Sequence, residues 1–211
     1  RTLHDRDFIE IVNGRAELRP EADIDALPED VRQLVVSRLD RLSDSARSLL
    51  WSAAILEADF TVEALAALSE TSDLDAIRLL VEELVSAQII QEVERGIHDF
   101  RHGMTQRVIY ETLSRMQRMK LHRLAVNFYR QQPRSIPQTM ALAFHLTRCG
   151  LLPQAVEVVV QAAETAEAEQ DIDGAIELYR HALALFPDEK SIHQHLERLQ
   201  ALRESALQPG E

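Results

Sequence analysis

The N-terminal part of the chain shows a hairpin pattern followed by a helix pattern. Apolar and polar residues alternate on both sides of Asn13-Gly14 within residues 8–19, and such a pair between alternating runs is a strong hairpin signal. Pro28 then suits the first turn of a helix, and apolar residues recur at three- and four-residue spacing as far as Leu42. We expect residues 1–42 to form a small β-hairpin and a linker or lid helix.

Residues 43–101 show three amphipathic helix patterns followed by two strand patterns. Each helix pattern begins after residues that cap helices well; the candidates are Ser43 or Ser45, Thr61, and Ser72 or Asp73. The β-rich runs 88–93 and 97–101 flank a turn at Glu94-Arg95-Gly96. Three helices followed by a hairpin is the order of a winged-helix domain, which we expect over residues 43–115.

Helical spacing resumes at Met104, after the polar segment Asp99-Phe100-Arg101-His102-Gly103, and extends to Phe128. The pattern jogs at Arg118-Met119-Lys120. This jog allows either a kink in one helix or two successive helices.

The C-terminal third contains a pattern typical of a tetratricopeptide repeat. In residues 171–188, the small residues Ala175 and Ala182 let two helices approach, and Pro187 ends the unit. A shift of 34 residues places Ala175 on Ala141 and Pro187 on Pro153.

This shift predicts one repeat over residues 122–155 and a second over residues 156–189. Apolar spacing then predicts a terminal capping helix over residues 190–205. We expect the whole repeat region to span residues 116–205. The predicted fold class is therefore mainly α: a winged-helix domain with small β-hairpins, followed by a tetratricopeptide-like helical repeat array.

Charge is distributed unevenly along the chain. The net charge is −12, but residues 101–134 carry eight Lys or Arg and one acidic residue. One interpretation is that this basic segment packs beside its own acidic neighbours; the other is that it meets an anionic or acidic partner. Nucleic acid is disfavoured as that partner, because the third helix of the winged-helix pattern is acidic and would be repelled by phosphates.

Several chemical functions are disfavoured by the composition. The six glycines do not occur in a phosphate-binding spacing, and one cysteine, Cys149, excludes an internal disulfide. We find no metal-ligand or catalytic motif, so catalysis by this chain is not expected. No run of 18 apolar residues and no leader pattern occurs, so we expect no membrane contact and a cytoplasmic location. The chain starts at Arg1, which we interpret as the start of an excised fragment.

Several segments together resemble the region that follows the nucleotide-binding core in STAND-class (AAA-type) bacterial signalling ATPases. The segments are Leu27-Pro28-Glu29-Asp30-Val31-Arg32, Ser37-Arg38-Leu39-Asp40-Arg41-Leu42, Ala53-Ala54-Ile55, Phe100-Arg101-His102-Gly103-Met104, Tyr110-Glu111-Thr112-Leu113 and Leu121-His122-Arg123. In some members the ATPase follows a class III adenylate or guanylate cyclase domain, and others are transcriptional activators. In that family a winged helix closes over the nucleotide pocket, and helical repeats form a sensor arm.

The resemblance implies a nucleotide-sensing role for His102, with Arg101 beside it. In related ATPases, a Met-His-Asp motif at the start of the last winged-helix helix places its histidine near the ADP phosphate. Arg101-His102-Gly103 occupies the corresponding place, with Gly103 where the family has an acidic residue. The alternative is that His102 only orders the turn between strand and helix.

The leading functional hypothesis is a non-catalytic regulatory fragment of a signal-transduction ATPase. ATP or ADP and magnesium are expected in the parent protein, with no cofactor in this fragment. The expected partners are the upstream ATPase domain of the same chain and a protein or small-molecule effector on the repeats. The alternatives are an interaction scaffold without nucleotide linkage and the regulatory arm of a transcription activator.

Overall fold

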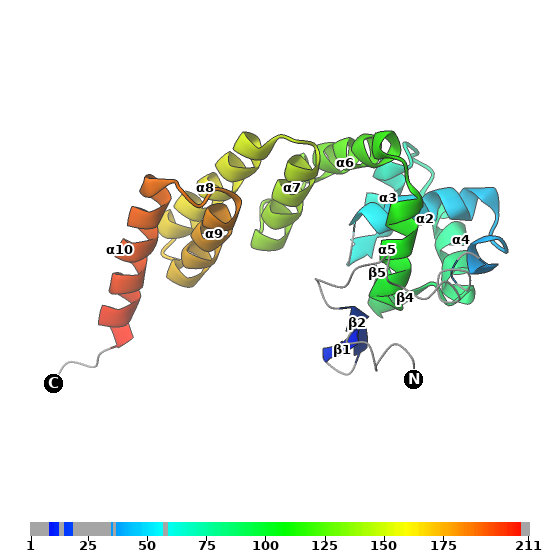
Figure 1. Ribbon diagram of the computed structural model, residues 1–211, viewed down its shortest axis with the longest axis horizontal. Coiled ribbons are helices and arrows are strands. Elements are labelled where there is room, and N and C mark those ends of the chain that lie inside the picture. Colours follow the sequence, from blue (N-terminus) through cyan, green and yellow to red (C-terminus); the bar gives the residue numbers. More distant parts are fainter. Residues whose placement is uncertain (1–8, 13–14, 19–34, 36, 57–58, 208–211) are drawn as a thin grey trace. The chain divides into compact units, whose positions relative to one another are not determined.

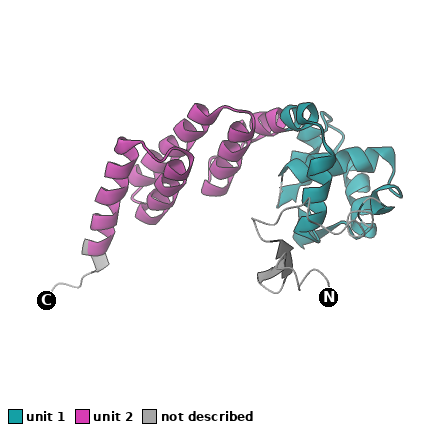
Figure 2. Ribbon diagram, in the orientation of Figure 1, with its two compact units in different colours: residues 1–121 teal, residues 122–211 magenta. Residues whose placement is uncertain are grey.

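The chain is mainly helical and carries small antiparallel sheets. The computed structural model describes residues 9–12, 15–18, 35, 37–56 and 59–207 (Figure 1). The chain divides into two compact units, residues 1–121 and residues 122–211 (Figure 2). The expected mainly α class is thus confirmed at this level.

The N-terminal hairpin is present. Strand β1 (Ile9–Val12) pairs antiparallel with β2 (Arg15–Leu18), and Val12 lies opposite Arg15. The turn at residues 13–14 and residues 19–34 of the expected linker lie outside the described residues. Residues 35 and 37–39 are helical, and Val35 and Leu39 are buried.

Unit 1 continues with three helices and a hairpin in the predicted order, and with a short strand, β3, that the pattern did not predict. The elements are α2 (Asp44–Leu56), β3 (Phe60–Thr61), α3 (Val62–Leu68), α4 (Leu74–Ser86), β4 (Ile90–Glu94), β5 (Ile97–Phe100) and α5 (Gly103–Thr112). The sheet has the strand order β3-β5-β4, and both pairings are antiparallel. The short strand between α2 and α3 therefore pairs with the second strand of the later hairpin.

The predicted capping residues begin the helices of unit 1. The Ser43 hydroxyl accepts a hydrogen bond from the N–H of Ala46 at 3.1 Å. The side chains of Thr61 and Asp73 accept equivalent bonds from residues three positions later, at 3.2 and 3.0 Å. Each bond satisfies a backbone donor that a helix start would otherwise leave free.

Helix α2 forms the centre of unit 1. Its residues Leu50, Ala53 and Ala54 have no exposed surface, and it packs against both α4 and α5. Two polar contacts fix these neighbours: the Gln106 amide donates to the Ala54 carbonyl at 2.8 Å, and the Ser43 hydroxyl donates to Glu83 at 2.9 Å.

The helical segment that follows the hairpin is interrupted, at an earlier position than the irregularity in its apolar spacing predicted. Helix α5 ends at Thr112, and α6 (Arg115–Arg130) begins three residues later, whereas the predicted jog lies at residues 118–120. Leu113, between the two helices, is extended and buried. Ser114 and Gln117 then cap each other. The Ser114 N–H donates to Gln117 Oε1 at 2.9 Å, and the Gln117 N–H donates to Ser114 Oγ at 3.3 Å. This capping box starts a new helix where the apolar spacing alone looked continuous.

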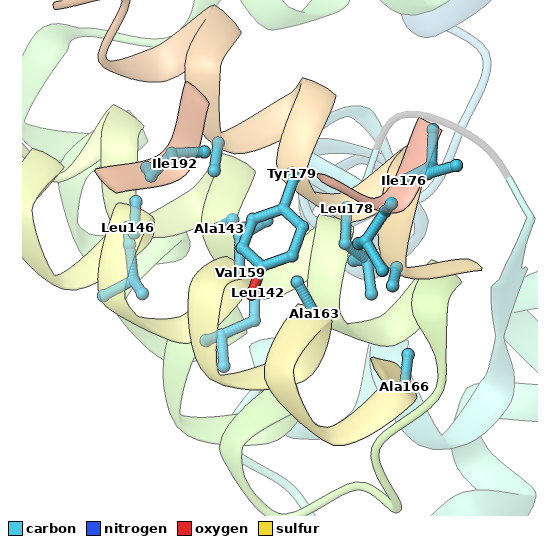
Figure 3. Packing of buried hydrophobic residues seen from close by; sticks show 14 of the residues in the cluster. Leu142, Ala143, Leu146, Val159, Ala163, Ala166, Ile176, Leu178, Tyr179 and Ile192 are labelled. Atoms are coloured by element: carbon cyan, nitrogen blue, oxygen red, sulfur yellow. The ribbon is translucent and has the colours of Figure 1, made fainter. Parts of the chain in front are cut away.

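Unit 2 consists of the end of α6 and four further helices. These are α7 (Ile136–Arg148), α8 (Leu152–Ala168), α9 (Ile172–Leu185) and α10 (Lys190–Leu207). Figure 3 shows the Tyr179 ring in one apolar cluster with side chains of α7 and α8, including Leu142 and Val159. Ala163, Ala175 and Ala182 have no exposed surface, so α8 and α9 pack closely.

The spacing between similar helices in unit 2 differs from the predicted shift of 34 residues. The N-cap residues of α7 and α9, Ser135 and Asp171, are 36 positions apart. At this shift Ala182 matches Leu146, which is buried, whereas a shift of 34 matches it to the exposed Arg148. The helix starts are thus two positions farther apart than the predicted shift, which aligned two prolines with different positions in the structure.

Those two prolines occupy different structural positions. Pro153 lies in the first turn of α8, where its missing N–H costs no helix hydrogen bond. Pro187 instead lies in the turn between α9 and α10.

A polar network joins α8, α9 and α10. The Tyr179 hydroxyl lies 3.4 Å from Glu167 Oε2 and 3.2 Å from His195 Nδ1. Glu167 also forms an ion pair with Arg198. Burial raises the pKa of Tyr179, so its hydroxyl stays protonated and able to donate.

Replacing Tyr179 by Phe should remove these hydrogen bonds while keeping the ring. We expect a loss of about 1 kcal/mol in the free energy of unfolding, measured by urea denaturation followed by circular dichroism. Tyr129→Phe is the matched control, because the Tyr129 hydroxyl has no hydrogen-bond partner among the described residues. Equal stability losses in the two variants would show that the network does not stabilise unit 2.

Candidate functional site

The predicted sensing residues lie at the turn between β5 and α5. The backbone N–H of Arg101 donates to the carbonyl of Ile89 at 3.0 Å, and His102 is the N-cap residue of α5. The side chains of both Arg101 and His102 are exposed. The His102 side chain makes no capping hydrogen bond, although its carbonyl accepts one from the N–H of Thr105 at 2.8 Å.

This turn has the chemistry of an anion-binding position. The start of a helix carries a partial positive charge, and the first turn of the ten-residue α5 contains no acidic side chain to neutralise it. Packing does not require a glycine at position 103, because nothing lies within 4 Å of the position that a Cβ atom would occupy. The nearby His98 belongs to the core, since it is 8% exposed and stacks on Phe60.

One basic side chain of the segment 101–134 forms an ion pair with an acidic residue of unit 1. Within unit 1, Lys120 forms an ion pair with Glu70 at 2.6 Å. Arg118 donates to the Leu113 carbonyl at 2.9 Å and lies over the Tyr110 ring. The other basic side chains of the segment form no ion pair within their own unit, in the part of the chain that the structure describes. Internal pairing therefore accounts for one of the eight cations.

A buried histidine pair, which the sequence patterns did not indicate, lies in unit 2. His122 on α6 and His145 on α7 are each 1% exposed, and their Nδ1 atoms are 2.9 Å apart. The Tyr129 ring stacks on His145 with 5.4 Å between ring centres. Burial, followed by the nearby His122 and Arg148, lowers the pKa of His145 to about 3.

This geometry requires a single shared proton between the two Nδ1 atoms. One ring must donate and the other must accept, so His145 is neutral near pH 7. The pair is too close for both Nδ1 atoms to bind one tetrahedral metal ion, since two bonds of about 2.0 Å would hold them farther apart. Among the described residues, no group of three or more histidine, cysteine or acidic side chains is placed to hold a metal.

A cavity of about 270 Å³ adjoins this pair in unit 2. It lies where the end of α6, the following loop, α7 and α8 meet, and Tyr129 connects it to His145. Arg130 and Arg134 line it, with no acidic residue beside them. In this cavity, side chains of the basic segment line a concave surface.

Comparison with known proteins gives one relative and no family. No family model matches the chain, and no solved structure matches it. The chain is 30% identical over 182 residues to an uncharacterized protein, R02095, of Rhizobium meliloti (strain 1021). This alignment covers 83% of the chain and 17% of the relative, so the chain spans less than a fifth of that protein. In the described part of the chain, no helix has the length and hydrophobicity for a membrane crossing.

The histidine pair should make the stability of unit 2 depend on pH. Because the pKa of His145 falls from 6.5 to about 3 on folding, the unfolded chain binds more protons within that range. Stability is therefore fully present above about pH 6.5 and decreases as the pH falls toward 3. From about pH 7 to about pH 5 we expect a loss on the order of 1 to 2 kcal/mol from this group.

The variant His145→Asn tests this dependence, because an asparagine amide nitrogen can replace Nδ1 but does not titrate. Urea unfolding at both pH values should show a smaller pH effect in the variant than in the wild type. His181→Asn is the control, because the His181 side chain is 45% exposed. The same pH dependence in His145→Asn as in the wild type would rule out the pair as its source.

Proposed function

We propose that the chain is a non-catalytic regulatory fragment of a STAND-class signal-transduction ATPase. Unit 1 acts as a winged-helix domain that senses the nucleotide state. Unit 2 acts as a tetratricopeptide-like sensor of a protein or ligand. ATP or ADP and magnesium belong to the upstream ATPase domain of the same parent protein.

The strand order of unit 1 supports the winged-helix assignment. In that fold a short strand between the first two helices pairs with the second strand of the wing hairpin. The order β3-β5-β4 has this arrangement, with Phe60 opposite His98 and Ile90 opposite Phe100. Helices α2, α3 and α4 precede the hairpin, as the assignment requires.

The helix pairs of unit 2 support the repeat assignment. Helices α7 and α9 begin at capping residues 36 positions apart. Helix α8 lies between them in the sequence and packs against both. The matching positions Leu142 and Leu178 are both buried, as are Ala143 and Tyr179. Such repeats bury apolar surface mainly against their sequence neighbours and leave extended surfaces for partners.

The exposure of His102 at the start of α5 carries the nucleotide-sensing part of the proposal. Its side chain makes no capping bond, so its ring is available to an outside phosphate, and the helix start favours negative charge. Arg101 adds an exposed cation beside it. In the parent protein, a contact with ADP would favour one arrangement of the winged helix, and loss of the contact would favour another.

His102→Ala in the full-length parent protein tests this role. Losing a hydrogen bond to a charged phosphate should speed ADP release by about tenfold or more, measured with a fluorescent ADP analogue in stopped flow. His181→Ala serves as the matched control, because it removes an exposed imidazole from α9. Unchanged ADP release and unchanged signalling output in His102→Ala would contradict nucleotide sensing and favour a scaffold without nucleotide linkage.

A further inference from the structure

Several hydrogen-bond donors that line the cavity in unit 2 have no protein acceptor in the described part of the chain. Arg134 makes no ion pair and no side-chain hydrogen bond in the described part of the chain, and Arg130 donates only to Gln154 Oε1, at 3.0 Å. The hydroxyls of Tyr129 and Thr139 also lack a hydrogen-bond partner among the described residues. A ligand that accepts hydrogen bonds and carries negative charge could contact these groups together.

The phenol of Tyr129 is suited to donate rather than to carry charge. Burial raises its pKa, so the hydroxyl stays protonated near neutral pH. Thr139 is 4% exposed, and its hydroxyl has no other described partner. A guanidinium can contact both oxygens of a carboxylate, and the two hydroxyls can bind the remaining lone pairs.

The cavity also offers an apolar wall and limited space. Leu142 from α7 and Val158 from α8 supply apolar surface to its lining. The volume of the cavity is about 270 Å³. This volume is close to the lower end of the range of roughly 300 to 1,000 Å³ that ligand pockets span, so it suits a small organic ligand.

We propose that this cavity binds a small organic carboxylate. The carboxylate contacts Arg130 and Arg134, and a short aliphatic chain lies against Leu142 and Val158. The inference rests on the sensing role proposed for unit 2 and names the class of its ligand. Inorganic anions fit less well, because they leave the apolar wall without a partner.

Ligand binding at this position would act on the packing of α6 against α7. Tyr129 lines the cavity and stacks on His145, which is hydrogen bonded to His122 of α6. A carboxylate held by Tyr129 therefore contacts a side chain that itself packs on His145. This contiguity gives the ligand a physical route to change the arrangement of the first helix pair in unit 2.

Hexanoate is a suitable probe because it has eight non-hydrogen atoms, one carboxylate and an aliphatic chain. Titration into the 211-residue protein, followed by NMR shifts or calorimetry, should give a dissociation constant of about 1 mM or tighter. Hexan-1-ol should bind at least about tenfold more weakly, because it lacks the charge. Acetate and inorganic phosphate should also bind more weakly, because they lack the aliphatic chain.

Arg134→Gln and Arg130→Gln should each weaken hexanoate binding by about tenfold. Arg180→Gln is the matched control, because Arg180 is exposed on α9 and does not line the cavity. Thr139→Val removes a hydroxyl at constant shape and should weaken binding by a smaller factor. Circular dichroism and thermal unfolding confirm that each variant is folded.

Three results would overturn the proposal. They are equal affinities for hexanoate and hexan-1-ol, equal affinities for hexanoate and inorganic phosphate, and unchanged hexanoate binding in the folded Arg130→Gln/Arg134→Gln double variant. If a short peptide that ends in leucine bound more tightly than hexanoate, the ligand of this cavity would be the C-terminal carboxylate of a peptide and not a small molecule. None of these titrations contains nucleotide, so failure here is distinct from failure of nucleotide sensing by His102.

Discussion

Close approach of helices through small side chains is the constraint on which both units depend. In unit 1, Ala53 and Ala54 let α2 lie between α4 and α5 with no exposed surface at either residue. In unit 2, Ala163 and Ala175 perform the same role between α8 and α9. Larger side chains at these positions would separate the helices, and overpacking of this kind costs about 1 to 3 kcal/mol.

This close packing determines where polar groups are tolerated inside the protein. The Gln106 amide can lie beside α2 because it donates to the Ala54 carbonyl, and His145 can be buried because His122 supplies its partner. Each of these bonds compensates for the removal of a polar group from water. The cavity beside Tyr129 differs, because the side chains of Arg134, Tyr129 and Thr139 have no such acceptor in the described part of unit 2. Two cationic side chains and two hydroxyls on one concave, partly apolar surface are the physical reason to regard the cavity as a binding site.

Local signals in the sequence predicted local structure well. The caps Ser43, Thr61 and Asp73 follow from the need of a helix start for side-chain acceptors, and the hairpins follow from alternation and turn residues. The break before α6 lies earlier than the predicted jog at residues 118–120, because a polar capping box lies inside an apolar pattern that continues across it. The histidine pair was missed because periodicity places a residue on a buried face but does not identify its partner, here 23 positions away. The sensing role of His102 and Arg101 rests on resemblance and remains a prediction.

Helix α6 provides the covalent connection through which two sensing events would be coupled. The division between the compact units falls within it, after Leu121, so one helix contributes residues to both units. A carboxylate on unit 2 can change nucleotide affinity only if it binds the two arrangements of the parent protein with different affinities. Linkage then requires that the nucleotide change carboxylate affinity by the same factor. Two sites joined by one helix thus form a regulatory device only when both ligands distinguish the same two states, and tight binding alone would leave the equilibrium unchanged.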